Sequence, residues 1–278
     1  MDGNQQWLQL FENISCLYRH MLMLPTWNKY SNYQNNIWDS LSIFLEGYAF
    51  ERQGRRPDYC HAAVDSLIHC RQQNNLDPDC IWNTFKKFLD NQKLNHRNNP
   101  LYPSTNPDNI TGIGNKHSLI EVILNDDFSN RTLTSFVQHK IDVNKNIMEI
   151  FDFLKLIRGI GDKIASFYLR DLVVVVGINV ADINKREYLQ PIDIWVERTV
   201  KKLAGNKNMS IRQIAKWIVI NCIQNNLNPE HVNMGIWFFC ASIANSEYRL
   251  NQALANMDMT HCLVSDFQMR VSNVCQNC

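Results

Sequence analysis

A lysine, Lys163, and an aspartate, Asp193, are the residues of this chain that most suggest catalysis. Lys163 closely follows a turn built on Gly159, Ile160 and Gly161, and Asp193 stands thirty residues later. Glycine tolerates backbone conformations that other residues avoid, so two glycines around one apolar residue favour a tight turn. The backbone N–H groups of such a turn can approach an anion without obstruction by side chains. The sequence therefore predicts a phosphate-binding turn immediately before Lys163.

Lys163 is the candidate nucleophile. The pattern predicts that it lies in the first turn of a helix over residues 162–172. The helix dipole and burial both disfavour a charged ammonium there, so the neutral amine becomes available. A neutral amine can attack an electrophilic carbon and go on to form a Schiff base. Considered alone, however, a lysine at this position would be an ordinary solvated helix residue.

Asp193 lies two residues after Pro191 and directly before an apolar helical pattern. Considered alone, Asp193 is typical of a helix N-cap, because aspartate accepts hydrogen bonds from the first free N–H groups of a helix. A catalytic interpretation rests on its pairing with Lys163. Two short motifs in this order, each in the expected structural setting, are more specific than either motif alone.

The pairing of Lys163 with Asp193 resembles the helix-hairpin-helix, Gly/Pro-Asp family of DNA base-excision glycosylases. Within that family the chain is most similar to the archaeal-type 8-oxoguanine DNA glycosylases, which are N-glycosylase/DNA lyases. The resemblance covers residues 151–203 and the surroundings of Trp237. It implies that Lys163 attacks C1′ of a flipped nucleotide, while Asp193 stabilises the developing positive charge and assists proton movement.

The same resemblance implies a pocket for the damaged base. Phe167 and Trp237 match the aromatic residues that stack on the two faces of the base, and a flipped base needs such stacking to replace what it loses. Asn233 stands where the family has an acidic residue, and Arg170 is the basic residue near Phe167. Tyr59 is a looser match to a further pocket aromatic. Without the flanking motif, Phe167 and Trp237 would be ordinary core aromatics.

The implied partner is double-stranded DNA that contains a damaged base, with Gly159, Ile160 and Gly161 on a backbone phosphate. Excision of 8-oxoguanine would be followed by β-elimination, which cuts the strand. Because the amine replaces an activated water, the reaction needs no metal and no cofactor. A monomer is the default expectation.

Two other functions remain open. A monofunctional glycosylase of the same fold would use water as the nucleophile and release the base without cutting the strand; Lys163 argues against it. A non-catalytic DNA-binding module would use the hairpin only as a phosphate clamp, with salt-sensitive binding that ignores damage.

Composition sets limits on these interpretations. The formal net charge of +1 is low for a DNA-binding protein, so a local basic face would have to contact the phosphates. Basic residues cluster at Arg52-Arg55-Arg56, Lys86-Lys87 and Lys201-Lys202, although each cluster alone is typical of a solvated helix face. The apolar runs are too short to cross a bilayer and no signal-peptide pattern begins the chain. These features predict a soluble protein of the cytoplasm (nucleoid-associated) or, in a eukaryote, of the nucleus.

The nine cysteines do not suggest a disulfide framework, since they are odd in number and scattered. Cys275 and Cys278 form a CxxC with Cys262 upstream, but no second close pair follows. The favoured interpretation is therefore a solvated tail without metal. The four-cysteine spacing of iron–sulfur glycosylases is absent.

Apolar residues at three- and four-residue steps predict an all-α fold with two helical subdomains and a helix-hairpin-helix at a DNA-binding cleft. The expected division is 1–55 with 186–278, carrying Asp193 and Trp237, and a central bundle over 56–185. The Val173–Val176 run is interpreted as the end of a helix closed by Gly177. Other helices are expected at 61–72, 118–125, 147–157, 162–172, 194–203, 210–225 and 229–243.

A second glycine turn at residues 111–116 copies the first one and its lysine, which is Lys116 here. The copy also keeps a small residue, Ser118, where the first turn has Ala165. A polar segment broken by prolines precedes Gly112, whereas a helix-hairpin-helix needs an amphipathic helix there. A simple turn before a helix is favoured, and a minor phosphate contact remains open.

Overall fold

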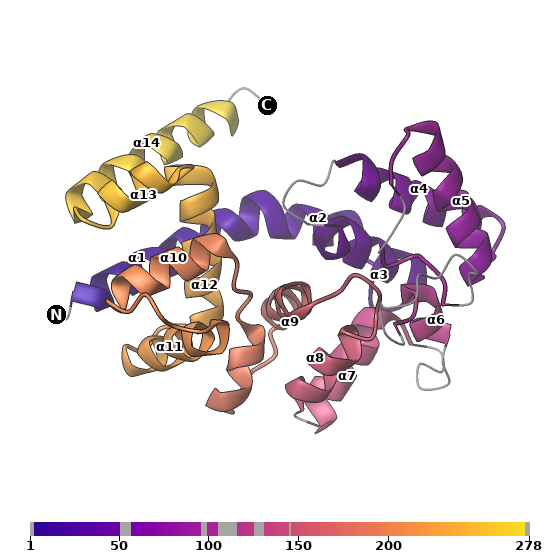
Figure 1. Ribbon diagram of the computed structural model, residues 1–278, viewed down its shortest axis with the longest axis horizontal. Coiled ribbons are helices and arrows are strands. Elements are labelled where there is room, and N and C mark those ends of the chain that lie inside the picture. Colours follow the sequence, from indigo (N-terminus) through magenta and orange to yellow (C-terminus); the bar gives the residue numbers. More distant parts are fainter. Residues whose placement is uncertain are drawn as a thin grey trace. The chain divides into compact units, whose positions relative to one another are not determined.

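The computed structural model describes residues 3–50, 57–95, 99–104, 116–124, 131–144 and 146–275 (Figure 1). The prediction of an all-α fold is confirmed, because these residues form helices and no β-strand. An isolated parallel bridge joins His117 to Ile157. Over the same ranges, no helix is both long and apolar enough to span a membrane.

The α-helices follow one another in the order labelled in Figure 1. They are α1 (Gly3–Tyr18), α2 (Leu24–Lys29), α3 (Ile37–Phe44), α4 (Pro57–Gln72), α5 (Pro78–Asn91), α6 (Leu119–Leu124), α7 (Leu133–Asn144), α8 (Ile147–Leu154), α9 (Asp162–Val176), α10 (Ile194–Leu203), α11 (Ile211–Gln224), α12 (Pro229–Phe238), α13 (Glu247–Ala253) and α14 (Met257–Cys275). Wider π-helical turns occupy Arg19–Met23, Leu45–Ala49 and Phe239–Ala244, and a 3₁₀ helix occupies Ile183–Leu189.

The chain divides into two compact units. The first unit combines Met1–Leu22 with Asp182–Cys278, and the second is Met23–Ala181. The sequence placed residues 23–55 in the first unit, whereas in the structure α2 and α3 belong to the second. The reason is side-chain packing, as in the 2.8 Å hydrogen bond between Ser40 Oγ on α3 and Thr134 Oγ1 on α7.

The first unit is built on close contact between α1 and α12. A Cβ added to Gly235 on α12 would lie 1.7 Å from the Phe11 carbonyl oxygen on α1, so only glycine permits this approach. The Phe11 and Phe239 rings pack beside this crossing with centroids 5.7 Å apart. Because the crossing leaves no space, α12 has a fixed position on α1.

The second unit has an aromatic core around Tyr168 of α9. Its ring lies 5.0 Å from Phe44, 5.2 Å from Tyr48 and 6.4 Å from Trp27. Burial raises the pKa of the Tyr168 hydroxyl, which also shares a 3.1 Å hydrogen bond with Thr134 Oγ1. Tyr168 therefore anchors α9 against side chains from α2, α3, the π-helical turn Leu45–Ala49 and α7.

The valine run ends α9 as predicted. The helix continues to Val176 and closes at Gly177, whose φ of 75° is favourable for glycine. The Gly177 N–H donates to the Val173 carbonyl at 3.0 Å. A β-branched run that could have formed a strand is therefore helical, and glycine ends it.

Candidate functional site in two parts: the Lys163 turn and the Asp193 helix start

A tight turn connects α8 to α9, as the glycine spacing predicts. Gly159 has a φ of 78°, which an L side chain rarely adopts. Ile160 is completely buried and anchors the turn, while its N–H donates to the Ile157 carbonyl at 3.1 Å. Gly161 is exposed and takes the N-cap position of α9.

The N-terminus of α9 has no side-chain cap, because Gly161 provides none. A Cβ built on Gly161 would meet no heavy atom within 4 Å beyond its chain neighbours, so the space in front of the helix is open. The first N–H groups of an α-helix have no intrahelical acceptor and carry partial positive charge. This end of α9 is therefore suited to an anion such as phosphate.

Lys163 is the second residue of α9 and is partly buried. The neighbouring acid, Asp162, forms a 2.7 Å ion pair with Lys155, which lies just after α8. In the part of the chain that the structure describes, no carboxylate pairs with Lys163. Its amine is thus free of the acid that stands next to it in the sequence.

Phe167 follows Lys163 by one turn on α9 and is partly exposed. Its ring meets the Tyr48 ring edge-on at 5.0 Å, and the Arg170 guanidinium lies 4.9 Å from its centre. These two neighbours fix the orientation of the Phe167 ring. A base could stack only on the ring surface that they leave exposed.

Arg170 is almost entirely buried, with 2% of its surface exposed. Its guanidinium forms a 2.7 Å ion pair with Asp171, whose other oxygen accepts a 3.1 Å hydrogen bond from Tyr48. Trp27 Nε1 donates to the same Tyr48 hydroxyl at 2.8 Å. The structure therefore gives Arg170 a partner within its own unit, and contact with the base remains a prediction.

Asp193 caps α10 in the first unit. Its Oδ1 accepts hydrogen bonds from the N–H groups of Trp195 and Val196, each at 2.9 Å. No donor among the described residues contacts Oδ2. The N-cap interpretation of Asp193 is thus confirmed, and one carboxylate oxygen is left for other chemistry.

Helix α12 holds the segment that leads to Asp193. Asn233 is completely buried, and its Nδ2 donates to the Pro191 carbonyl at 3.2 Å. Trp237 lies one turn further along α12, partly exposed, with its ring 5.9 Å from Tyr18 in an edge-on arrangement. Asn233 therefore has a positioning contact, whereas its expected contact with a base stays untested.

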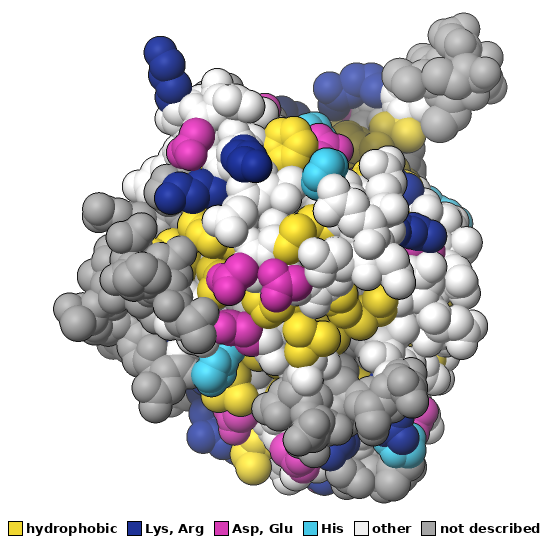
Figure 2. All heavy atoms as spheres, turned by 90° about the vertical axis from the view of Figure 1, so that its right-hand side faces the viewer, with side chains coloured by type: hydrophobic (Ala, Val, Ile, Leu, Met, Phe, Trp, Pro, Cys, Tyr) yellow, Lys and Arg dark blue, Asp and Glu magenta, His cyan; other side chains and the backbone are white. Residues whose placement is uncertain are grey.

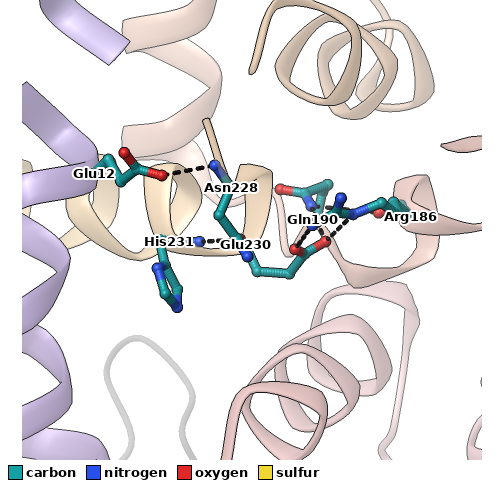
Figure 3. Close-up of polar contacts among 6 residues, drawn as sticks. All are labelled: Glu12, Arg186, Gln190, Asn228, Glu230 and His231. Carbon is teal, nitrogen blue, oxygen red and sulfur yellow. Dashed lines mark hydrogen bonds and ion pairs between the residues drawn. The ribbon is translucent and has the colours of Figure 1, made fainter. Parts of the chain in front are cut away.

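A second attachment of the same segment involves Glu230, which lies one turn before Asn233 on α12 (Figure 3). The buried Glu230 carboxylate pairs with Arg186, and the Gln190 side-chain amide lies 3.5 Å from it. The Asn228 N–H donates to Glu12 on α1 at 2.6 Å. Through these contacts α12 ties α1 to the segment before α10.

Tyr59 lies in the first turn of α4. Its hydroxyl donates to the Asn95 carbonyl at 2.6 Å, and its ring stacks on Phe50 at 6.3 Å. Phe50 precedes α4 and Asn95 follows α5. These contacts therefore do not support the predicted role of Tyr59 as a pocket aromatic.

The predicted site residues fall into two groups. Helix α9 and its turn bring together Gly159, Ile160, Gly161, Lys163, Phe167 and Arg170 in the second unit. In the first unit, α10 and α12 bring together Asp193, Asn233 and Trp237. Sequence reasoning missed Tyr48, Asp171 and Glu230, since their roles depend on contacts between distant segments. The adjacent charges of Arg170 and Asp171 were the one local signal available.

Possible metal ligands and basic clusters are the remaining features that the sequence singles out. No group of three or more His, Cys, Asp or Glu side chains that could hold a metal occurs among the described residues. The side chains of Cys275 and Cys278, the cluster at Arg52-Arg55-Arg56, and both Gly112 and Gly114 lie outside them. Figure 2 shows one face, on which Lys and Arg side chains are scattered and acidic side chains gather near the centre.

Comparisons with known proteins do not assign a family. No protein-family model matches the chain, and no solved structure matches it. A similar curated protein is the uncharacterized protein MJECL21 of Methanocaldococcus jannaschii, at 24% identity over 292 aligned positions. That alignment takes in 86% of this chain and 66% of MJECL21, so the chain spans somewhat less than two-thirds of its relative.

Proposed function

We propose that this chain is a bifunctional DNA glycosylase and apurinic/apyrimidinic-site lyase that excises 8-oxoguanine. The single observation that carries the proposal is the setting of Lys163. Its amine lies behind a glycine turn, at a helix start without a side-chain cap, and the adjacent acid Asp162 is paired with Lys155 instead. Such a start binds phosphate, and an unpaired amine next to it can attack the sugar of the bound strand.

The reaction follows from the amine. Lys163 Nζ attacks C1′ of the flipped nucleotide, and the glycosidic bond breaks with its electron pair leaving on the base. Loss of an amine proton and opening of the sugar ring give a Schiff base. Removal of a C2′ proton then expels the 3′ phosphate by β-elimination, and water releases the lysine.

Asp193 serves the same step through its charge. A positive charge develops on the sugar as the base departs, and a carboxylate stabilises that charge. Oδ1 is engaged by the α10 amides, so Oδ2 is the atom assigned to the sugar and to proton transfer.

Stacking on the damaged base is assigned to Phe167 and to Trp237, each a partly exposed aromatic residue of its own unit. Stacking contributes about 1–3 kcal/mol per base. Arg170 braces one ring through its guanidinium, and Asn233 holds the segment before Asp193. The substrate is duplex DNA, the protein acts as a monomer, and the reaction takes place where DNA is stored, in the cytoplasm or the nucleus.

The test is borohydride trapping on a duplex that contains 8-oxoguanine. The native chain should give a covalent adduct with this duplex and none with an undamaged duplex of the same sequence. Lys163→Gln should give no adduct and no strand cleavage, because the Schiff base needs the amine. Chelation with EDTA should leave the native activity unchanged.

Lys140→Gln is the matched control, since it removes a lysine of the same unit and leaves both Lys163 and the Lys155–Asp162 ion pair in place. It should keep the adduct. Release of free base without an adduct would point to water as the nucleophile and to a monofunctional enzyme. If the chain binds DNA but gives neither an adduct nor free base with any of a panel of damaged bases, the hairpin would serve only to bind phosphate.

A further inference from the structure

We propose that Lys116 is a positioning residue, which aims the Gly161 amide at a DNA phosphate. This inference rests on the proposed function, because it concerns the DNA contact of the same turn. Lys116 comes from the second glycine copy at residues 111–116, which the proposed reaction does not otherwise use.

The contact that carries the inference joins the two copies. Lys116 Nζ donates to the Ile160 carbonyl at 3.0 Å. The Ile160–Gly161 peptide is planar and trans, so its C=O and N–H point in opposite directions. Because the ammonium holds the carbonyl, the Gly161 N–H faces away from Lys116.

Gly161 lies at an open surface position. Gly161 is exposed, and a Cβ on it would contact no heavy atom within 4 Å beyond its chain neighbours. Its N–H has no acceptor among the described residues. A cation on the carbonyl also polarises the peptide, which strengthens the N–H on the opposite side as a donor.

The segment that carries Lys116 is itself fixed to the turn. The buried Arg158 donates from Nη2 to the Lys116 carbonyl at 2.9 Å and from its backbone N–H to the His117 carbonyl at 2.8 Å. The His117 N–H donates to the Leu156 carbonyl at 3.0 Å. Lys116 and the turn therefore hold each other by several short contacts, and the ammonium has little freedom to move away.

Lys163 and Lys116, which follow the two similar glycine motifs of the sequence, thus have different roles. Lys163 has no acidic partner in the described structure, whereas the Lys116 amine donates to the Ile160 carbonyl. Lys116 therefore supports the turn before Lys163 and is not a second nucleophile.

The experiment measures equilibrium binding of a duplex that contains a tetrahydrofuran abasic-site analogue, over a series of salt concentrations. Lys116→Met should weaken binding about tenfold, which corresponds to the loss of one hydrogen bond to a charged group. The slope of log affinity against log salt should stay at the native value, because no phosphate loses a cation contact. Lys116→Arg keeps the donor and should bind within about threefold of the native chain.

Turnover gives a second readout, on a duplex that contains 8-oxoguanine. Lys116→Met should raise KM and leave kcat unchanged, since the chemistry belongs to Lys163. Lys140→Met is the matched control, because Lys140 lies 4.0 Å from Glu149 at the start of α8, away from the turn. It should change neither parameter.

Several results would overturn the inference. A salt slope reduced by about one in Lys116→Met would mean that Lys116 itself contacts a phosphate. Native-like binding by Lys116→Met would remove any role for the contact. In the native chain, a Gly161 amide resonance that does not shift on duplex addition would also contradict it, whether or not the variants fold. If the native chain binds no duplex, the proposed function fails first and the inference falls with it.

Discussion

Helices α9 and α10 both begin at a point that the sequence marks clearly, and they differ in the residue at the N-cap. Asp193 fills the N-cap of α10 and accepts two amide hydrogen bonds. Gly161 fills the N-cap of α9 and has no side chain to cap it, so only its carbonyl accepts a hydrogen bond, from the Ala165 N–H at 3.0 Å. An aspartate satisfies a helix start from within the chain, whereas a glycine leaves it to solvent or to a ligand.

Helix starts with a side-chain N-cap are common among the described residues. Side chains cap α3, α5, α8, α11, α12 and α13, through Asn36, Asp77, Asn146, Ser210, Asn228 and Ser246. The comparison between α9 and α10 suggests that stability was given up at α9 to leave its amides accessible. Substitutions at the two helix starts, and in the segments that hold them, test this difference.

Asp193→Asn keeps the N-cap of α10 and removes the negative charge of the carboxylate. Asparagine caps a helix as well as aspartate does, so the free energy of unfolding should stay close to native. The rate of strand cleavage in a single turnover should fall by about 10²–10⁴, the usual contribution of a group that moves protons. Asp193→Ala should lose the same activity and also about 1 kcal/mol of stability. Native cleavage by Asp193→Asn would show that Asp193 is only a cap.

Gly161→Asp gives α9 an aspartate N-cap, which is the cap that α10 has. The backbone there has a φ of −116°, which any residue adopts, and the site is open. The new carboxylate should cap α9 and raise stability by a few tenths of a kcal/mol. It should also repel a phosphate, so duplex affinity should fall at least about tenfold. Gly161→Ala adds the Cβ without the charge, and a similar loss in that variant would point to steric effects instead.

Asn233→Asp tests how the start of α10 is held. The change replaces the Nδ2 donor with an oxygen that faces the Pro191 carbonyl, so unfolding in urea should show a loss of about 1–3 kcal/mol. Asn208→Asp, at an exposed position, should cost little. If Asn233→Asp keeps native stability but changes which damaged base is cut, Asn233 reads the base instead of holding the loop.

Glu121 provides a pH-dependent test near the α9 turn. Burial would raise the pKa of this carboxyl, but hydrogen bonds from Ser104 and Ser118 outweigh burial and lower it below its usual value. A group with a lowered pKa in the folded state stabilises the fold above its unfolded pKa of about 4.3. That contribution disappears as the pH falls through the lower, folded value.

Glu121→Gln should therefore lose about 1 kcal/mol of stability at neutral pH, as measured by urea unfolding. The difference from the native chain should shrink as the pH falls below about 4. A difference that stays constant from neutral to acid pH would mean that the carboxylate charge does not stabilise the segment that leads from Lys116 into α6.

Local patterns were enough to predict several elements. Helix α10 covers the predicted residues 194–203, and Gly177 ends α9. The positive φ at Gly159 and the cap at Asp193 also follow from residue type alone. These features depend on neighbours within one turn of the chain, which is the range over which backbone sterics and capping act.

Other boundaries needed the folded chain. The helix expected to reach residue 157 ends at Leu154, because the following residues pair with His117 and build the turn. The helix expected over 229–243 changes to a wider π-helical form after Phe238. Helix α1, which no motif indicated, became essential through its contact with Gly235.

The all-α chain, the glycine turn before Lys163 and the aspartate that begins α10 can all be read from residue types and their order. The pairing of Asp171 with Arg170 and Tyr48, the contact of Asn233 with Pro191 and the contact of Lys116 with Ile160 appear only in the folded chain. The two sets differ in the separation of the partners along the chain. Periodicity and capping act over a few residues, while each of these buried polar contacts depends on packing that joins separate segments.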